Sequence, residues 1–133
     1  MKRVLFLLLQ DYADWEAAPL AAAVNSTKGW QVRTVSLTRE PVRSIGGFTL
    51  LPDWDLSQAM GQEFAGLVLI GGKSWRTKEA EQVEPLVRRA REKGAVLAGI
   101  CDASVYLGTL GMLNDADHTS NQMADLQNYA GDR

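Results

Sequence analysis

Short apolar runs alternate along the chain with longer segments in which apolar residues recur every three or four positions. Three of these runs, residues 3–9, 66–70 and 95–100, are apolar almost without interruption, which is typical of strands buried on both faces of a sheet. In residues 31–37, apolar residues instead alternate with polar ones, and this spacing also predicts a strand. The pattern therefore predicts strands in all of these segments.

The segments between the strands predict helices over residues 14–28, 76–93 and 103–110. Asp14 is a suitable N-cap for the first helix, and Gly29 is a suitable stop for it. Shorter features are also expected: a hairpin or turn at Gly46 and Gly47 within residues 43–51, a helical turn at 56–60, a strand end at 117–119 and a short helix at 123–129.

This alternation of strands and helices predicts an α/β fold with a mostly parallel sheet and helices on both of its faces. We expect a single domain over residues 1–133, because the chain has the length of one domain and shows no repeat or linker. Ligands of such sheets bind beyond the carboxyl ends of the strands. Residues 10–16, 71–75 and 101–104 are expected at that edge.

Composition and charge exclude several classes of protein. Lys and Arg total 14 against 16 Asp and Glu, a formal net charge of −2, so neither a nucleic acid nor a membrane is an expected partner. The apolar run at residues 4–9 is too short to cross a membrane, and no cleavage site of a signal peptide follows it. The single cysteine excludes an internal disulfide framework, and the cytoplasm is the expected location.

The residue types also predict no metal and no cofactor. One cysteine and one histidine cannot supply the four such ligands of the usual zinc site. The chain lacks the glycine patterns that bind dinucleotides and nucleotide phosphates. A small-molecule substrate is therefore expected to react with side chains of the protein itself.

The strongest candidate for such chemistry is Cys101, in the segment Gly99–Ile100–Cys101–Asp102–Ala103. It follows an apolar run, opens a predicted helix, and has small residues two positions before and after it. A nucleophile elbow requires small residues there, because the turn between strand and helix is sharp. The helix start favours a thiolate, so we expect a lowered thiol pKa. The alternative is a small buried cysteine with no reaction of its own.

Three further features could serve a thiol nucleophile. The N–H groups of Gly72 and Asp102 could together bind an oxyanion, although Gly71 and Gly72 could equally form an ordinary turn. Glu16 could place its carboxyl beside the thiol, or it could simply favour the start of a helix. His118, the only histidine, could activate the thiol or be a structural or exposed residue.

Together these motifs resemble the ThiJ/PfpI family, within the class I glutamine amidotransferase-like superfamily. The matching segments cover nearly the whole chain in the family's order: residues 2–9 with Asp14–Trp15–Glu16, then Leu69–Ile70–Gly71–Gly72, Ala98–Gly99–Ile100–Cys101–Asp102–Ala103, Leu110–Gly111–Met112–Leu113–Asn114 and His118–Thr119–Ser120–Asn121. The resemblance implies a flavodoxin-like three-layer sandwich and a homodimer.

The resemblance also implies roles for individual residues. Cys101 would be the nucleophile, Glu16 its carboxylic partner and His118 a nearby base. The N–H groups of Gly72 and Asp102 would hold the oxyanion. We further expect three residues around the pocket: Trp15, Gly71 and Trp75.

The chain departs from the family pattern in two ways. Members of the protease and hydrolase branch often carry histidine directly after the nucleophile, where this chain has Asp102. Family members also continue through another strand pair and a closing helix, so we expect this chain to lack the closing C-terminal elements. The strand at residues 95–100 is expected to lie centrally in the sheet, with a neighbour on each side.

The leading interpretation is a cysteine-dependent amidase or glutamine amidotransferase-like hydrolase that acts on a small carbonyl or amide substrate. One alternative is a non-catalytic redox- or stress-responsive protein whose Cys101 is oxidised reversibly. A second alternative is a catalytically inactive scaffold that dimerises through its surface.

Overall fold

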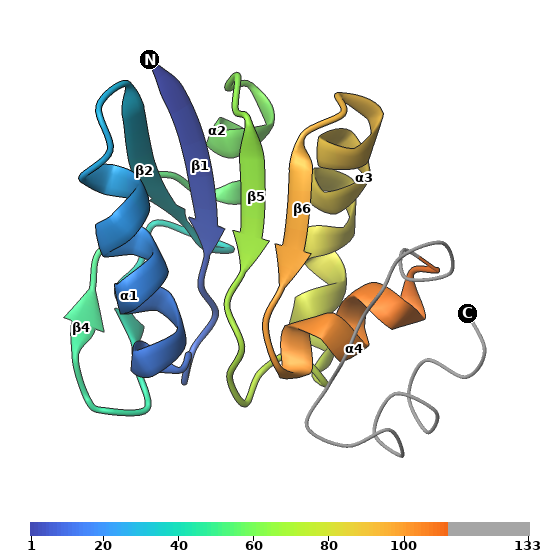
Figure 1. The fold of residues 1–133 in the computed structure, drawn as a ribbon. Helices are drawn as coiled ribbons and strands as arrows, with labels where there is room; N and C mark the ends of the chain where they lie inside the picture. The colour runs from blue at the N-terminus through green and yellow to red at the C-terminus, as the bar shows by residue number, and fades with distance from the viewer. Residues whose placement is uncertain (112–133) are drawn as a thin grey trace.

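The computed structural model describes residues 1–111 and has a parallel four-stranded sheet at its centre (Figure 1). The strands are β1 (Lys2–Leu7), β2 (Trp30–Val35), β5 (Gly66–Leu69) and β6 (Val96–Gly99). They stand in the order β2-β1-β5-β6, and each is joined to the next parallel strand through at least one helix. The α/β flavodoxin-like fold predicted from the sequence is confirmed.

Helices cover both faces of this sheet (Figure 1). The helix α1 (Asp14–Asn25) packs on one face, whereas α2 (Leu56–Met60) and α3 (Glu84–Glu92) pack on the other. A 3₁₀ helix, η1 (Lys78–Val83), leads directly into α3, and α4 (Asp102–Thr109) follows β6. The arrangement gives the three layers expected of the fold.

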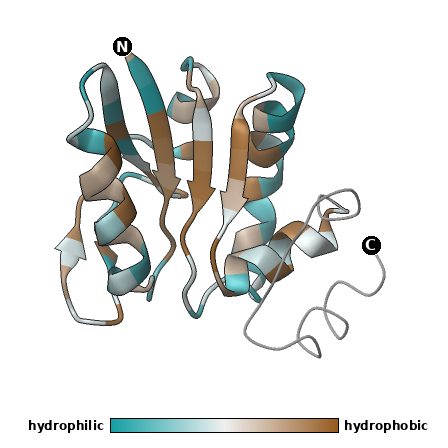
Figure 2. Cartoon of the chain, viewed as in Figure 1, coloured by the Kyte–Doolittle hydropathy of each residue, from teal (hydrophilic) through white to brown (hydrophobic). Residues whose placement is uncertain are grey.

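Each face of the sheet buries its own apolar cluster, and Figure 2 shows the middle of the sheet in the brown of hydrophobic residues. Leu5 and Leu7 of β1 join the cluster under α2 and α3, whereas Val4 and Phe6 join the cluster under α1. Successive side chains of a strand point to opposite faces. A strand covered on both faces must therefore be apolar at nearly every position, which explains the uninterrupted runs in the sequence.

The carboxyl ends of the strands meet at one edge of the sheet. Leu7 of β1 is paired in register with Val35 of β2 and with Leu69 of β5, and Leu69 is paired with Gly99 of β6. The segments that follow these residues therefore leave the sheet side by side. This is the edge at which parallel sheets bind their ligands.

The first helix differs from its prediction at both ends. Its N-cap is Ala13 and not Asp14, which is the first helical residue. The Asp14 carboxylate accepts the N–H of Gly46 at 2.8 Å instead of an N–H of its own helix. The helix ends at Asn25, earlier than predicted, and the Asn25 side chain accepts the N–H of Val32 at 3.0 Å. Such side-chain bonds to the backbone compete with continuation of a helix.

The single helix predicted over residues 76–93 is divided into η1 and α3. Pro85 lies in the first turn of α3. Proline has no N–H to donate to the preceding turn, and its ring collides with a helical carbonyl there, so Pro85 favours the first turn of a new α-helix over the middle of a longer one. The stop at Gly94 has a φ of 73°, the left-handed conformation that glycine adopts readily.

Among residues 1–111, β6 stands at the end of the sheet with β5 as its neighbour. A central position was predicted for this strand in a fold completed by further C-terminal elements, and the described residues, which end at 111, do not test that prediction. The crossover through η1 and α3 adds β6 on the outer side of β5. Val96, at the start of β6, is 72% exposed.

The predicted hairpin is present as an antiparallel pair, β3 (Val42–Arg43) and β4 (Thr49–Leu50). Gly47 in its turn has a φ of 86°. The Ile45 N–H donates to the Tyr12 carbonyl at 2.9 Å, so the hairpin is held against the loop between β1 and α1.

The predicted features at residues 117–119 and 123–129 lie outside the described residues. Within residues 1–111, no helix combines the length and the apolar character that a membrane span requires.

Candidate active site

Cys101 lies at the turn that joins β6 to α4. Its φ of 52° and ψ of −122° put a non-glycine residue in a sparsely populated backbone region. The Ile100 N–H still continues the sheet by donating to the Leu69 carbonyl at 3.0 Å. Three residues later the Ala103 N–H donates to the Ile100 carbonyl at 3.1 Å, so strand becomes helix within one residue. This geometry is the nucleophile elbow that the sequence predicted.

The small residues on either side of Cys101 are required by close packing. A Cβ atom on Gly99 would lie 2.8 Å from Leu107 Cδ1 and 3.0 Å from the Ala103 carbonyl oxygen. Ala103 itself is fully buried. A larger side chain at either position would push the start of α4 away from the end of β6.

Ser104 supports the elbow and was missed in the sequence. Its hydroxyl donates to the Cys101 carbonyl at 2.6 Å, its N–H donates to the same oxygen at 2.9 Å, and the side chain is buried. These two bonds hold the Cys101 peptide in its unusual conformation. The available signal was a serine in the first turn of a predicted helix, where hydroxyl bonds to the backbone are common.

Glu16 and Cys101 meet at Gly71. A Cβ atom on Gly71 would lie 2.5 Å from Glu16 Oε1 and 3.0 Å from Cys101 Cβ, so only a glycine leaves room for both side chains. Together with burial, the Glu16 carboxylate raises the pKa of the Cys101 thiol through its charge and through hydrogen bonding. Glu16 Oε1 is buried and has no hydrogen-bond partner among the described residues. The site thus joins a thiol to a carboxylate that retains an unused acceptor.

The electrostatics of the site oppose ionisation of the thiol. Burial, the negative charge and hydrogen bond of Glu16, and the charge of Asp102 raise the pKa of Cys101 above its ordinary value. The sequence predicted a lowered pKa from the helix start alone, and that direction is wrong. An ordinary thiol is already protonated at neutral pH, and burial together with the two carboxylates favours the protonated form further, so a proton must leave the sulfur as it reacts.

The N–H groups of Gly72 and Asp102 are both available at this edge. Among the described residues, neither group donates a hydrogen bond. The backbone around Gly72 is fixed, because the Ala13 N–H donates to the Gly71 carbonyl at 2.8 Å and the Lys73 N–H donates to the Asp11 carbonyl at 3.2 Å. Two N–H groups beside a thiol are what binding of an oxyanion requires.

Asp102 is paired with an arginine that the sequence did not single out. Arg76, in the loop after β5, lies 3.1 Å from the Asp102 carboxylate, and both side chains are largely shielded, at 29% and 23% exposure. No motif or spacing in the sequence indicated this pair, because the two residues come from separate turns of the chain.

The other predicted residues occupy different places. Trp15 is 63% exposed beside Glu16, whereas Trp75 is 4% exposed and its indole N–H donates to the Ile70 carbonyl at 2.6 Å. Trp75 also packs on Tyr106, with ring centroids 5.0 Å apart, and lines a hollow of about 240 Å³ at the start of η1. His118 lies outside the described residues.

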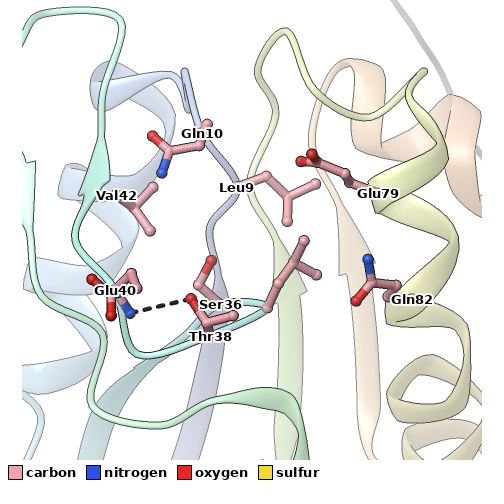
Figure 3. Close-up of a pocket in the computed structure, with 9 residues that line it drawn as sticks. Leu9, Gln10, Ser36, Thr38, Glu40, Val42, Glu79 and Gln82 are labelled. Carbon is pink, nitrogen blue, oxygen red and sulfur yellow. Dashed lines mark hydrogen bonds between the residues drawn. The ribbon is translucent and has the colours of Figure 1, made fainter.

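A separate hollow of about 400 Å³ lies between the loop after β2 and η1 (Figure 3). Leu9 and Gln10 line it after the end of β1, Thr38 and Glu40 line it from the loop, and Glu79 lines it from η1. Cys101 does not line it. Within residues 1–111, no group of three or more His, Cys, Asp or Glu residues is placed to hold a metal ion.

The fold and the elbow define a flavodoxin-like α/β protein with a cysteine at the point where a parallel strand turns into a helix. The model of the DJ-1/PfpI family matches residues 2–132. The chain therefore belongs to the DJ-1/PfpI family, and the resemblance seen in its motifs is confirmed.

Individual relatives agree with this assignment. The chain is 42% identical over 122 residues to the uncharacterized protease YdeA of Bacillus subtilis (strain 168), covering 91% of this chain and 60% of YdeA. It is 28% identical to the uncharacterized protease YoaZ of the same organism, covering 98% of this chain and 68% of YoaZ. The chain thus spans about two thirds or less of the length of these relatives.

A solved structure shows the same fold. The DJ-1 superfamily protein Atu0886 from Agrobacterium tumefaciens superimposes with a TM-score of 0.86 at 37% sequence identity. The match covers 98% of this chain and 71% of that protein.

Proposed function

We propose that the protein is a cysteine-dependent amidase or glutamine amidotransferase-like hydrolase that acts on a small carbonyl or amide substrate. The observation that supports this proposal is the close approach of Glu16 and Cys101 at Gly71, next in sequence to the N–H groups of Gly72 and Asp102, which donate no hydrogen bond among the described residues. The names of the two Bacillus relatives, both described as proteases, also support cleavage of an amide bond.

The proposed reaction begins from a protonated thiol. Its sulfur attacks the carbonyl carbon of an amide while the thiol proton passes to the Glu16 carboxylate. The N–H groups of Gly72 and Asp102 donate to the oxygen that becomes negative. The carbon–nitrogen bond then breaks, the amine leaves with the proton held by Glu16, and a thioester remains on Cys101.

Water completes the proposed reaction by attacking the thioester. The carboxylic acid leaves, and the sulfur recovers a proton, so the enzyme returns to its starting state. By resemblance to the family, His118 is proposed as a second group that moves protons in this half of the reaction. A thiol that must stay reduced in order to react fits a cytoplasmic location.

A panel of small primary amides, glutamine and acyl thioesters tests this proposal. Release of ammonia or free thiol should occur with the native chain and be lost in Cys101→Ala, while the thermal unfolding midpoint changes little. Intact mass of the protein during turnover should show an acyl group bound to Cys101. If none of the substrates is turned over and no acyl adduct forms, hydrolysis is not the function.

The second candidate function is a redox response at Cys101. The unpartnered Oε1 of Glu16 favours it, because an oxidised sulfur acid would bring a hydrogen-bond donor to that oxygen. One equivalent of hydrogen peroxide should then give a stable sulfenic product at Cys101, and a second equivalent a stable sulfinic product, each identified by mass spectrometry. Under the hydrolase proposal, peroxide inactivates the enzyme and that product has no separate role.

We also propose that the protein forms a homodimer, as the family resemblance implies. Large apolar side chains are exposed on α1 and on the neighbouring hairpin: Trp15 at 63%, Phe48 at 71% and Leu51 at 65%. An exposed group of this kind is typical of protein–protein contacts. Light scattering of the native chain and of Phe48→Ser should show a dimer that dissociates in the variant. A monomer at all working concentrations would contradict the proposal.

A further inference from the structure

The Arg76–Asp102 ion pair joins two segments that are far apart in the chain. Arg76 belongs to the loop between β5 and η1, and Asp102 is the first residue of α4. One guanidinium nitrogen lies 3.1 Å from Asp102 Oδ1, within hydrogen-bond distance. The two side chains are 29% and 23% exposed, and Asp102 directly follows Cys101 in the chain, so the pair lies next to the elbow.

Each partner of this pair is close in sequence to one of the unpaired N–H groups. The loop of Arg76 also carries Gly72, and Asp102 supplies its own N–H directly after the nucleophile. Other hydrogen bonds fix the loop to the segment after β1: the Lys73 N–H donates to the Asp11 carbonyl and the Ser74 hydroxyl donates to the Gln10 carbonyl at 2.6 Å. The ion pair adds a polar link from this loop to the elbow.

Two acidic residues act on the thiol. The negative charges of Glu16 on α1 and of Asp102 on α4 both oppose its ionisation. Arg76 reaches the same place from the loop after β5 and pairs with one of these carboxylates. An opposite charge offsets part of the repulsion that a developing thiolate meets.

We propose that Arg76 is a positioning residue for Cys101: it holds the loop of Gly72 against the start of α4 and offsets the charge of Asp102 beside the thiol. The proposal rests on the proposed role of Cys101 as the reactive group. Arg76 acts through Asp102 and does not contact the substrate in this assignment.

The test measures alkylation of Cys101 by iodoacetamide, an uncharged reagent, as a function of pH. In Arg76→Gln, Asp102 loses its counter-charge, so the thiol pKa should rise and alkylation at pH 7.5 should slow by roughly two- to fivefold, the effect of one partly exposed ion pair. Arg76→Lys should recover most of the native rate. Arg88→Gln, which removes the 3.4 Å pair with Glu84 on α3, is the matched control and should leave the profile unchanged.

A double-mutant cycle separates action through Asp102 from any other effect of Arg76. Asp102→Asn should lower the thiol pKa, and the effect of Arg76→Gln should be clearly smaller in that background. Equal effects in both backgrounds would overturn the proposal. A native-like dependence of alkylation on pH in Arg76→Gln would also overturn the proposal, whether or not the unfolding midpoint of the variant falls.

These outcomes are distinct from failure of the proposed function. If the native chain is alkylated at Cys101 but Arg76→Gln is unaltered, the positioning role fails and the nucleophile stands. If the native chain turns over no substrate while Arg76→Gln still shifts the alkylation profile, the hydrolase fails and the positioning role stands.

Discussion

The side chain of Glu16 faces the side chain of Cys101 across the backbone of Gly71. The two residues lie near opposite ends of the described chain, in segments that follow the carboxyl ends of strands. A Cβ atom on Gly71 would nevertheless touch both side chains. Burial raises the pKa of the thiol, and Glu16 and Asp102 raise it further. The thiol therefore keeps its proton at rest, and in the proposed reaction Glu16 accepts it.

Replacing Glu16 should change reactivity and turnover in opposite directions. Glu16→Gln removes a negative charge and a hydrogen bond that hold the proton on Cys101, so the thiol pKa should fall and iodoacetamide should react about three- to tenfold faster at pH 7. Hydrolysis should slow by about 10²-fold or more, because the proton acceptor is gone.

Alkylation quenched at set times and followed by mass spectrometry measures the reactivity of Cys101. An ammonia-release assay measures the rate of hydrolysis. Glu92→Gln, an exposed residue at the end of α3, is the control and should alter neither. If alkylation slows in Glu16→Gln, the carboxylate does not raise the thiol pKa.

Adding one methyl group at Gly71 should damage the site. In Gly71→Ala the new Cβ would lie 2.5 Å from Glu16 Oε1 and 2.6 Å from the Ile100 carbonyl oxygen. The backbone carbonyl of Ile100 cannot move aside as a flexible side chain can, so the free energy of unfolding should fall by about 1–3 kcal/mol. The rate of alkylation of Cys101 should also change. Urea unfolding and the alkylation assay measure these effects.

Gly61→Ala is the matched control for Gly71→Ala. Gly61 has a φ of −87°, and the nearest atom to a Cβ there is 3.6 Å away. Its free energy of unfolding should stay the same or rise by less than about 1 kcal/mol. Equal stability of the two variants would show that the contacts at Gly71 relax without cost.

Asp14 should contribute to stability against acid. Hydrogen bonds from Ser44 and from the Gly46 N–H lower the pKa of Asp14 below its ordinary value. A group with a lowered pKa in the folded state stabilises the fold above its unfolded pKa and loses that contribution as pH falls through the folded value. Stability should therefore decline below about pH 4, the ordinary range for aspartate.

Urea midpoints at pH 7 and pH 3 measure this contribution. The drop between the two pH values should be smaller in Asp14→Ala than in the native chain, because the variant has already lost the contact with the hairpin. Glu92→Ala should show the native drop. An identical drop in Asp14→Ala would mean that the hairpin contact does not depend on the charge of Asp14.

Tyr106 offers a prediction at the alkaline end. Its hydroxyl is buried without a hydrogen-bond partner among the described residues, and burial together with Glu84 raises its pKa. A group with a raised pKa in the folded state makes its full contribution to stability below its unfolded pKa, about 10 for tyrosine. That contribution is lost as pH rises through the folded pKa. Tyr106→Phe should therefore lose part of the decline in stability above pH 10.

At neutral pH, Tyr106→Phe should leave the free energy of unfolding unchanged or raise it by up to about 1 kcal/mol, because an unsatisfied buried hydroxyl is removed. Tyr12→Phe is the contrast, because hydrogen bonding with Ser44 acts on the pKa of Tyr12, and the variant should lose about 1 kcal/mol. Thermal and urea unfolding measure both. A clear loss in Tyr106→Phe would reveal a partner for its hydroxyl.

The local pattern of the chain was sufficient for the strands and for the elbow. A strand between two helical layers must be apolar at nearly every position, so β1, β5 and β6 could be located from their runs. The sharp turn at Cys101 could be predicted because Gly99 and Ala103 must be small for α4 to pack against the end of β6. Each of these constraints acts on residues that are close in sequence, so it can be recognised from a short segment of the sequence.

The sequence by itself determined most of the elements and the elbow at Cys101, and the tertiary structure decided what surrounds that cysteine. The contact of Glu16 with Cys101, the pair of Arg76 with Asp102 and the outer position of β6 all depend on how separate turns meet at one edge of the sheet. The direction of the thiol pKa was mispredicted for the same reason. Electrostatic energy depends on distances between charges, and the distances between α1, the loop after β5 and α4 exist only once the chain has folded.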